Sequence, residues 1–424
     1  MSLEIGRRPT ADGTAADGTA DRAGAQPAGP VAAQPPAVEA GTAKGGAGRG
    51  VAGGPYPPGP VRAPVSLTVG KYSALLLFAL FIVIFGALKP HLFLTVSTFR
   101  LTFGEGVVTA VLALAFLVPL AAGIFDLSIG AMMGLSLVLI NWFAANTDIP
   151  VGLVCLGAVL VCCLVGLVSG FLVVRFRVNS LIATLGVSQV LTAVGLKVSD
   201  NRQITGAFSD RFATLGSTNL LGVPVVVLYL LALAVILWFV LEHTPVGRYL
   251  FAVGSNPEAA RLAGLPAERL VYGSLIASGG VAGIAGVIYA MRVGAYTADS
   301  GSGLLFPALA AVFFGASQFS RRPNVWGTLV AYFALAFGVK GLQLAFGPGT
   351  FWIQPLFQGV ALLIAVALAS RQVAQTRRSR RTQAAAAESE STSGSGSKSG
   401  SRSGSGSGAQ PEPVATGEPR APAP

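Results

Sequence analysis

The sequence predicts an all-α, polytopic membrane protein, a transmembrane helical bundle of about ten spans with a disordered tail at each end. Hydrophobic residues make up 52% of the 424 residues and charged residues only 11%, which is too apolar for an ordinary water-soluble domain. Apolar stretches of roughly 17 to 25 residues, the length that crosses a hydrocarbon core as a helix, recur from Tyr72 onward. These stretches are continuously apolar, which argues against the alternating strands of a β-barrel.

Ten apolar stretches define the predicted spans, and almost all are long enough to cross the bilayer as a helix. The eighth is short enough to be re-entrant or broken. The predicted spans are Tyr72–Leu88, Gly106–Ala122, Leu127–Phe143, Val151–Val174, Ser180–Val198, Val223–Leu241, Val271–Met291, Leu304–Gln318, Trp326–Leu342 and Phe351–Ala369.

The two ends of the chain differ in composition from the predicted transmembrane domain, residues 65–370. Met1–Pro64 is rich in Ala, Gly and Pro, and Arg371–Pro424 contains the low-complexity run STSGSGSKSGSRSGSGSG. Neither could bury enough apolar surface to offset the entropy of folding, so both are predicted to be disordered tails. The start, MSLEIGRRPTADG, lacks the apolar region of a signal peptide, so the first span is expected to target the chain to the membrane.

Lys and Arg residues in the short loops predict the orientation, because such loops are retained on the cytoplasmic side. The bias places both termini inside, in the cell (plasma) membrane. This topology and a basic tail near anionic membrane lipid explain the net charge of +11 better than nucleic-acid binding does. The segments predicted to be cytoplasmic carry Arg62, Lys71, Arg175, Arg177, Arg248, Arg261, Arg269, Arg321, Arg322 and the basic residues from Arg371 onward, and the external segments carry Lys89, Arg100, Arg202, Arg211 and Arg292.

The sequence contains no pattern that indicates catalysis, a cofactor or a metal. Its three cysteines, Cys155, Cys162 and Cys163, lie in one apolar span, and its two histidines, His91 and His243, lie outside the spans. Buried, reduced thiols are therefore expected. The sequence has no phosphate-binding loop, zinc-protease motif or nucleophile elbow, so we expect a conduit that does not itself hydrolyse ATP.

A short polar helix is predicted between the sixth and seventh spans, within a cytoplasmic segment of residues 242–270. Asn256 is placed to cap its start, Pro257 occupies the first helical position, Glu258 lies in the positive first turn and Gly264 ends it. A helix of this length is not stable alone in water and therefore requires a partner surface.

The partner of this helix follows from its side chains. Ala259, Ala260 and Ala263 keep one side small enough to enter a groove, and Arg261 adds a cation that can reach a carboxylate. The alternative is an amphipathic helix resting on the bilayer or on its own bundle, but such a helix would carry bulky apolar residues on one side. The pattern favours docking to a cytoplasmic protein.

Four segments, in order, resemble the permease subunits of ATP-binding-cassette importers, specifically the ribose and simple-sugar branch. TPVGRYLFAVGSNPEAARLAGLP resembles the coupling segment of that family, with Glu258-Ala259-Ala260 as its EAA element and Gly264 as the loop glycine. The other three are AAGIFDLSIGAMMGLS (Ala121–Ser136), NSLIATLGVSQVLTAVGL (Asn179–Leu196) and VWGTLVAYFALAFGVKGLQL (Val325–Leu344). Where the branch commonly carries a glycine-rich segment before the late span, this chain reads GASQFSRRPN (Gly315–Asn324).

The resemblance implies a permease that pairs with itself or a close homologue, two cytoplasmic ATP-binding subunits and an extracytoplasmic sugar-binding protein. It further implies alternating access, with ATP closing the ATPase dimer and the coupling helices transmitting that motion. The residues it assigns to ATPase coupling are Gly247, Arg248, Asn256, Pro257, Glu258, Ala259, Ala260, Arg261 and Gly264.

Several polar residues within the spans are candidates for a translocation path, and each has a structural alternative. Asp126 could contact substrate, but capping of the third span is favoured for it. Thr184, Ser188 and Thr192 share one helical face and could line a path or pack helices. Further candidates are Ser128, Asn141, Trp142, Gln189 and Tyr289, whereas Gly279 and Gly283 form a small-xxx-small pair for which close helix packing is expected.

Two other functions are open from the sequence. A permease for branched-chain amino acids or nucleosides is the closest rival, and an ion-coupled secondary transporter is the rival from a different class. Such a carrier places ionisable groups in the middle of the membrane. The predicted spans hold almost none, since Lys197, Lys340 and Glu105 are expected near span ends.

Overall fold

The computed structural model describes residues 73–220, 222–316, 322–347, 349–364 and 367. The chain divides into a unit of residues Met1–Val61, of which no residue is described, and a unit of residues Arg62–Pro424, which contains every described element. The two expected tails, Met1–Pro64 and Arg371–Pro424, lie outside the described residues.

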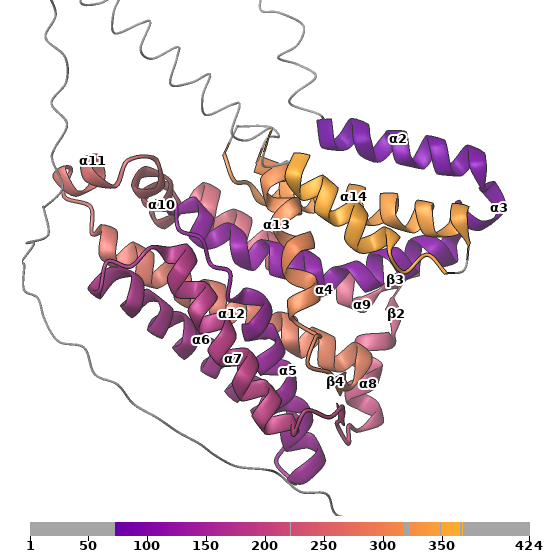
Figure 1. The fold of residues 1–424 in the computed structure, drawn as a ribbon, viewed down its shortest axis with the longest axis horizontal. Coiled ribbons are helices and arrows are strands. Elements are labelled where there is room, and N and C mark those ends of the chain that lie inside the picture. Colours follow the sequence, from indigo (N-terminus) through magenta and orange to yellow (C-terminus); the bar gives the residue numbers. More distant parts are fainter. Residues whose placement is uncertain (1–72, 221, 317–321, 348, 365–366, 368–424) are drawn as a thin grey trace, which may run out of the picture. The chain divides into compact units, whose positions relative to one another are not determined.

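The described residues form a helical bundle, which confirms the predicted fold class (Figure 1). Among them, seven helices are long and apolar enough to cross a membrane, and three shorter apolar helices complete a one-to-one match with the ten predicted spans. The seven are α4 (Val96–Ala121), α5 (Ile129–Asn146), α6 (Val151–Arg175), α7 (Ser180–Ser199), α9 (Val225–Trp238) continued by the π-helical turn η1 (Phe239–His243), α12 (Ala267–Val293) and α14 (Val325–Phe346), and the three are α2 (Ser73–Leu88), α13 (Ser302–Ala316) and an unlabelled helix, Ile353–Ile364.

Short elements connect these helices. The small helices are α3 (Pro90–Phe93), α8 (Asp210–Ser217), α10 (Pro245–Ser255) and α11 (Pro257–Leu262). Strand β1 (Ile204–Thr205) pairs antiparallel with β4 (Ala295–Tyr296), with Ile204 opposite Tyr296, and β2 (Asn219–Leu220) pairs with β3 (Val223–Pro224). These two-residue strands join connecting segments by hydrogen bonds. The fold remains all-α.

The second span begins at Val96, ten residues earlier than predicted. The Thr95 hydroxyl accepts a hydrogen bond from the Thr98 amide at 3.2 Å and so caps the helix at that point. The apolar stretch had been predicted to start at Gly106 because polar residues precede it. Glu105 therefore lies within α4 and not before its start.

The eighth span is as short as the sequence predicts. Helix α13 has 15 residues with Pro307 inside it, and extends for about 22 Å, less than the roughly 30 Å hydrocarbon core. The residues that follow it, 317–321, lie outside the described part of the chain.

Helices α6 and α12 approach each other through glycines, as the small-xxx-small pair predicts. A Cβ on Gly279 would meet the Cys162 carbonyl, and one on Gly283 would lie 3.0 Å from the Cα of Val159. Gly166 of α6 similarly faces the carbonyl of Leu275. Only residues without a side chain allow this backbone contact, so the prediction of close packing is confirmed.

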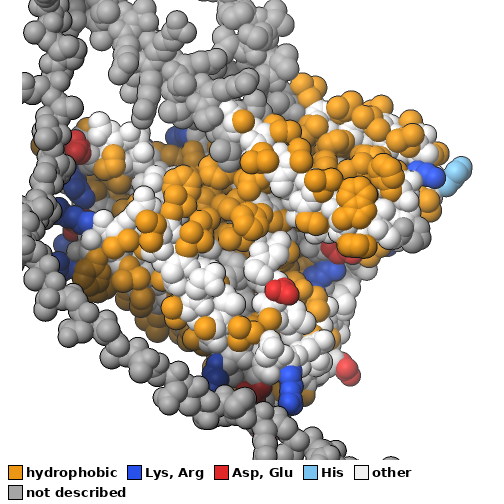
Figure 2. Space-filling model, viewed as in Figure 1, with side chains coloured by type: hydrophobic (Ala, Val, Ile, Leu, Met, Phe, Trp, Pro, Cys, Tyr) orange, Lys and Arg blue, Asp and Glu red, His pale blue; other side chains and the backbone are white. Residues whose placement is uncertain are grey.

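Helix α4 lies at the centre of the bundle, and α6 and α7 lie at its periphery. Nearly every residue of α4 from Gly106 to Pro119 is buried, and it packs against α5, α9, α12, α13 and α14. Helix α6 instead exposes Leu153, Leu156 and Leu164, each about 60% accessible. Figure 2 shows hydrophobic side chains over most of one face, with Lys and Arg gathered at its left margin, beside α10 and α11. A surface of this kind fits lipid contact.

Candidate functional site

The predicted coupling helix is present as α11, and its capping follows the prediction. The Asn256 side-chain oxygen accepts from the Ala259 amide at 3.1 Å, and Pro257 occupies the first helical position. Gly264 has φ +79°, a left-handed conformation that favours glycine. The amide of Gly264 donates to the carbonyl of Arg261 and that of Leu265 to the carbonyl of Ala260, which is the Schellman pattern.

The two sides of α11 are not arranged as expected. Ala260 is only 5% exposed because it packs on Val253 and Ala267 of the same chain. The expectation that Ala260 belongs to a free docking face is therefore wrong. The exposed face instead carries Leu262, 91% accessible, together with Glu258, Ala259, Arg261 and Ala263.

Helix α10 anchors this segment to the end of α4. A Cβ on Gly254 would come within 2.9 Å of the Gly123 amide nitrogen and would also meet the Ala121 carbonyl, so the two backbones touch. At the other end of α10, a Cβ on Gly247 would clash with the Leu241 carbonyl of η1, whereas Arg248 is exposed. Helix α10 therefore connects α11 to the end of α4 by direct backbone contact.

Arg322, which the sequence analysis counts only among the cytoplasmic basic residues, also holds this segment. Arg322 lies 2.5 Å from the Glu242 carboxylate of η1, and its guanidinium carbon lies 4.7 Å from the ring centre of Phe251 in α10. Asn324, two residues later, caps α14 by accepting from the Gly327 amide at 2.6 Å. The segment Gly315–Asn324, where the chain departs from the resembled family, thus ends at the coupling region.

Asp126 lies at the centre of a hydrogen-bonded group that joins three helices, which we call the Asp126 cluster: Asp126, Ser128, Ser180, Thr184 and Ser278. The carboxylate is fully buried and accepts from the Ser128 amide at 3.0 Å, the Ser128 hydroxyl at 2.5 Å and the Ser278 hydroxyl at 2.8 Å. The formal N-cap of α5 is Ser128, so the predicted N-cap position is wrong by two residues. Asp126 nevertheless satisfies a free amide at the start of that helix.

Helix α7 holds the other side of the α4–α5 connection. The Ser180 hydroxyl accepts from the Phe125 amide at 3.2 Å, and the Thr184 hydroxyl accepts from the Leu127 amide at 3.1 Å. Thr184 also donates to the Ser180 carbonyl at 2.8 Å. Each of these side chains is occupied in joining segments of the chain.

The remaining predicted path residues do not converge on one space. Asn141 is fully buried; its amide group donates to the Leu137 carbonyl at 2.9 Å and accepts from the Gly206 amide at 3.0 Å, which ties β1 to α5. Thr192 donates to the Ser188 carbonyl within α7 at 2.9 Å. Gln189 is exposed, and Ser188, Trp142 and Tyr289 are half-buried.

The segment that follows α12, with strand β4, lies at the end of the bundle opposite α11. Tyr296 of β4 is 3% exposed, and its hydroxyl lies 2.6 Å from where a Cβ on Gly195 of α7 would be. Burial, together with the nearby Asp299 carboxylate, raises the pKa of Tyr296 above its usual value. The phenol therefore stays neutral at ordinary pH.

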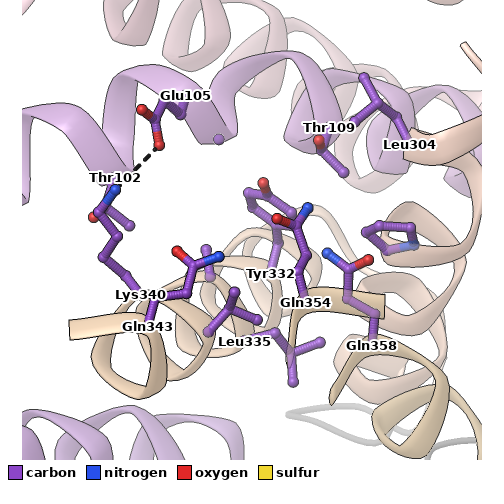
Figure 3. A pocket seen from close by; sticks show the side chains of 14 residues that line it. Thr102, Glu105, Thr109, Leu304, Tyr332, Leu335, Lys340, Gln343, Gln354 and Gln358 are labelled. Atoms are coloured by element: carbon purple, nitrogen blue, oxygen red, sulfur yellow. Dashed lines mark ion pairs between the residues drawn. The ribbon is translucent and has the colours of Figure 1, made fainter. Parts of the chain in front are cut away.

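Polar side chains do converge in a different place, which we call the glutamine pocket. This cavity of about 150 Å³ lies between α4, α13, α14 and the helix Ile353–Ile364. Figure 3 shows the amides of Gln343, Gln354 and Gln358 directed into the same space as the ring of Tyr332. The residues that line it are Thr102, Glu105, Gly106, Thr109, Leu304, Pro307, Tyr332, Leu335, Ala336, Val339, Lys340, Gln343, Gln354 and Gln358.

An ion pair lies at one side of the glutamine pocket. Lys340 Nζ of α14 is 3.6 Å from Glu105 Oε2 of α4, as the dashed line in Figure 3 marks. The guanidinium of Arg292 approaches α4 at Gly104, the residue before Glu105. A Cβ on Gly104 would lie 2.6 Å from this guanidinium. A side chain at this position would displace the guanidinium from its place beside α4.

None of the nine predicted path residues lines the glutamine pocket, and none of the residues that line it was predicted to belong to a translocation path. One signal in the sequence could have found it. Gln354 and Gln358 are four residues apart in an otherwise apolar span, which places both amides on one helical face. Polar residues within membrane spans are costly and mark functional surfaces.

These features together define a transport permease: a multi-pass bundle with a polar cavity near one end and an exposed, capped helix at the other. Residues 100–367 match the family described as "Branched-chain amino acid transport system / permease component", and the chain belongs to that family. No solved structure matches the chain.

Three relatives within this class of permease are named for the transport of sugars. The D-allose transport system permease protein AlsC of Escherichia coli (strain K12) is 31% identical over 301 residues, 70% of this chain and 91% of that protein. The fructose import permease protein FrcC of Rhizobium meliloti is 32% identical, over 69% of this chain and 83% of its own. The ribose import permease protein RbsC of Haemophilus influenzae is 30% identical, over 61% and 80% respectively.

Proposed function

We propose that this chain is the membrane subunit through which an ATP-binding-cassette importer moves a simple sugar into the cell. The observation that carries the proposal is the alignment with the allose permease over 91% of that protein's length, at 31% identity. The matched family is named for branched-chain amino acid transport, but the relatives at about 30% identity are named for allose, ribose and fructose. They favour a sugar over an amino acid.

The partners in this proposal are two cytoplasmic ATP-binding subunits, an extracytoplasmic sugar-binding protein and a second permease subunit. ATP hydrolysis belongs to the partners, and this chain supplies the path. The described basic residues near α10 and α11 support a cytoplasmic location for that end, with both termini inside. They are Arg175, Arg177, Arg248, Arg261, Arg269 and Arg322.

The contacts suggest how motion of the ATPases would reach the path. Helix α11 seats on the ATPase and moves α10, which touches the end of α4 at Gly123. The Asp126 cluster fixes the following connection to α7 and α12, so these elements shift together. The first half of α4 lines the glutamine pocket, about 18 to 28 Å away along the helix. Nucleotide drives transport only by favouring one of two such arrangements.

The test of the coupling surface uses the exposed face of α11. Leu262→Asp places a charge on an apolar contact that is 91% accessible in this chain, so the permease itself should insert and melt normally. We expect the ATP-binding subunit that co-purifies with the permease to fall at least fivefold. Leu215→Asp on α8, where the leucine is 48% exposed, is the matched control and should leave co-purification unchanged. Undiminished co-purification with Leu262→Asp would overturn this assignment.

A further inference from the structure

The glutamine pocket is large enough to admit a six-membered ring. Its volume is about 150 Å³, and a cavity of that volume in another protein accepts benzene, a six-membered ring. That cavity is dry because its lining is wholly apolar. The glutamine pocket differs in its lining, because amide and hydroxyl groups share its walls with Leu335, Pro307 and Val339.

The three amides are free to bind a ligand. Within the described part of the chain, no side-chain hydrogen bond occupies Gln343, Gln354 or Gln358, although other polar side chains of the bundle are paired. Each amide offers two donors and a carbonyl acceptor. Gln343 and Gln358 are half-buried and Gln354 is exposed, so their amides remain accessible to water or to a polar solute that enters the cavity.

The charges of the pocket favour a neutral solute. Glu105 and Lys340 lie 3.6 Å apart and neutralise each other. An amino acid would need both groups for its ammonium and carboxylate, and would have to break that pair. A polyhydroxylated ring needs only donors and acceptors around its edge and apolar contact on its face, which amides and residues such as Leu335 supply.

We propose that the glutamine pocket is a binding subsite for a neutral monosaccharide on its way through the permease, held by Gln343, Gln354 and Gln358. This assignment rests on the proposed sugar-import function and adds the place where the sugar binds. The pocket lies on the first half of α4, whereas α10 contacts its last turn, so the subsite is at the end away from the coupling helix. A sugar released outside the cell would meet it first.

The experiment uses the complete transporter, with its ATP-binding subunits and binding protein, in proteoliposomes. Uptake of tritiated D-ribose, D-allose, D-fructose and L-leucine is measured for the wild type and for the double variant Gln354→Leu, Gln358→Leu. We expect sugar uptake to fall at least tenfold in the double variant, while ATPase activity stimulated by the loaded binding protein is retained. Gln203→Leu, at an exposed glutamine outside the pocket, is the matched control and should stay within twofold of the wild type.

A second measurement separates binding from folding. In a background without Cys155, Cys162 and Cys163, a single Gln354→Cys substitution is labelled with an impermeant thiol reagent during turnover. The transported sugar should slow labelling at least threefold, and L-leucine should not. The subsite alone would be overturned if the wild type takes up sugar, the double variant takes it up equally well, and sugar does not slow the labelling of Gln354→Cys. Uptake of L-leucine without any sugar would overturn the proposed function and the ligand class together.

Discussion

The Asp126 cluster buries its polar side chains and satisfies them within the chain, whereas the glutamine pocket gathers half-buried and exposed glutamines that have no such partner. In the cluster, the buried Asp126 carboxylate accepts three hydrogen bonds, and the hydroxyls of Ser180 and Thr184 accept amides from the α4–α5 connection. In the pocket, Gln354 and Gln358 make no side-chain hydrogen bond to another described residue.

This difference separates groups that hold the fold from groups that are available to a solute. A buried polar group needs a partner, and a partner within the chain makes it part of the structure. A polar group that faces a cavity without such a partner is available to whatever enters. The comparison predicts that changes in the Asp126 cluster lower stability, whereas changes in the glutamine pocket lower transport.

The largest expected effect is that of Asp126→Ala. It removes the common acceptor of Ser128 and Ser278 and leaves buried donors unpaired, which costs about 3–5 kcal/mol. The midpoint of thermal unfolding in detergent should fall by roughly 6 °C or more. Asp126→Asn keeps one carbonyl acceptor and should lose less. If the alanine variant melts with the wild type, the cluster does not hold the fold and the comparison fails.

A smaller loss is expected for Thr184→Val, which keeps the side-chain shape and removes the hydroxyl. The Leu127 amide then loses its acceptor, at a cost of about 1–3 kcal/mol. Thr192→Val is the matched control on the same helix, because its hydroxyl only donates to the Ser188 carbonyl of its own turn. That variant should stay within about 0.5 kcal/mol of the wild type in urea unfolding. Equal losses at the two positions would contradict the cross-helix role of Thr184.

The sequence predicts the helices well, because hydropathy and capping act over neighbouring residues. All ten spans correspond to observed apolar helices, and the Asn256 to Gly264 helix is capped as expected. The start of α4 was missed because Thr98, Thr102 and Glu105 interrupt the apolar stretch. The hydroxyls of Thr98 and Thr102 donate to the carbonyls of Leu92 and Thr98, and Glu105 pairs with Lys340, so these polar groups are accommodated in the helix. Hydropathy does not record such partners.

The sequence does not predict which polar residues meet in space. Asp126 and Ser278 are 152 residues apart, and only the fold brings them to 2.8 Å. Gln343 and Gln358 belong to different helices and converge in the same way. The small alanines of α11 look equivalent along the chain, yet Ala260 faces Val253 while Ala259 faces outward. Each of these outcomes depends on tertiary packing, which local pattern does not specify.

The smallest expected effect on stability is that of Glu105→Gln, and it gives the sharpest test of the comparison. The Glu105 side chain is 57% exposed, and an ion pair as accessible as that with Lys340 contributes about 0.2–1 kcal/mol. Glu105→Gln and Lys340→Gln, alone and together, form a double-mutant cycle in which the coupling energy should stay below about 1 kcal/mol. Asp126→Asn, the same kind of change in the cluster, should cost more because its carboxylate is fully buried. If Glu105→Gln lowers the melting temperature as much as Asp126→Asn, the ion pair holds the bundle together as the Asp126 cluster does. The polar side chains of the pocket would then stabilise the fold, and they would no longer differ in this respect from those of the Asp126 cluster.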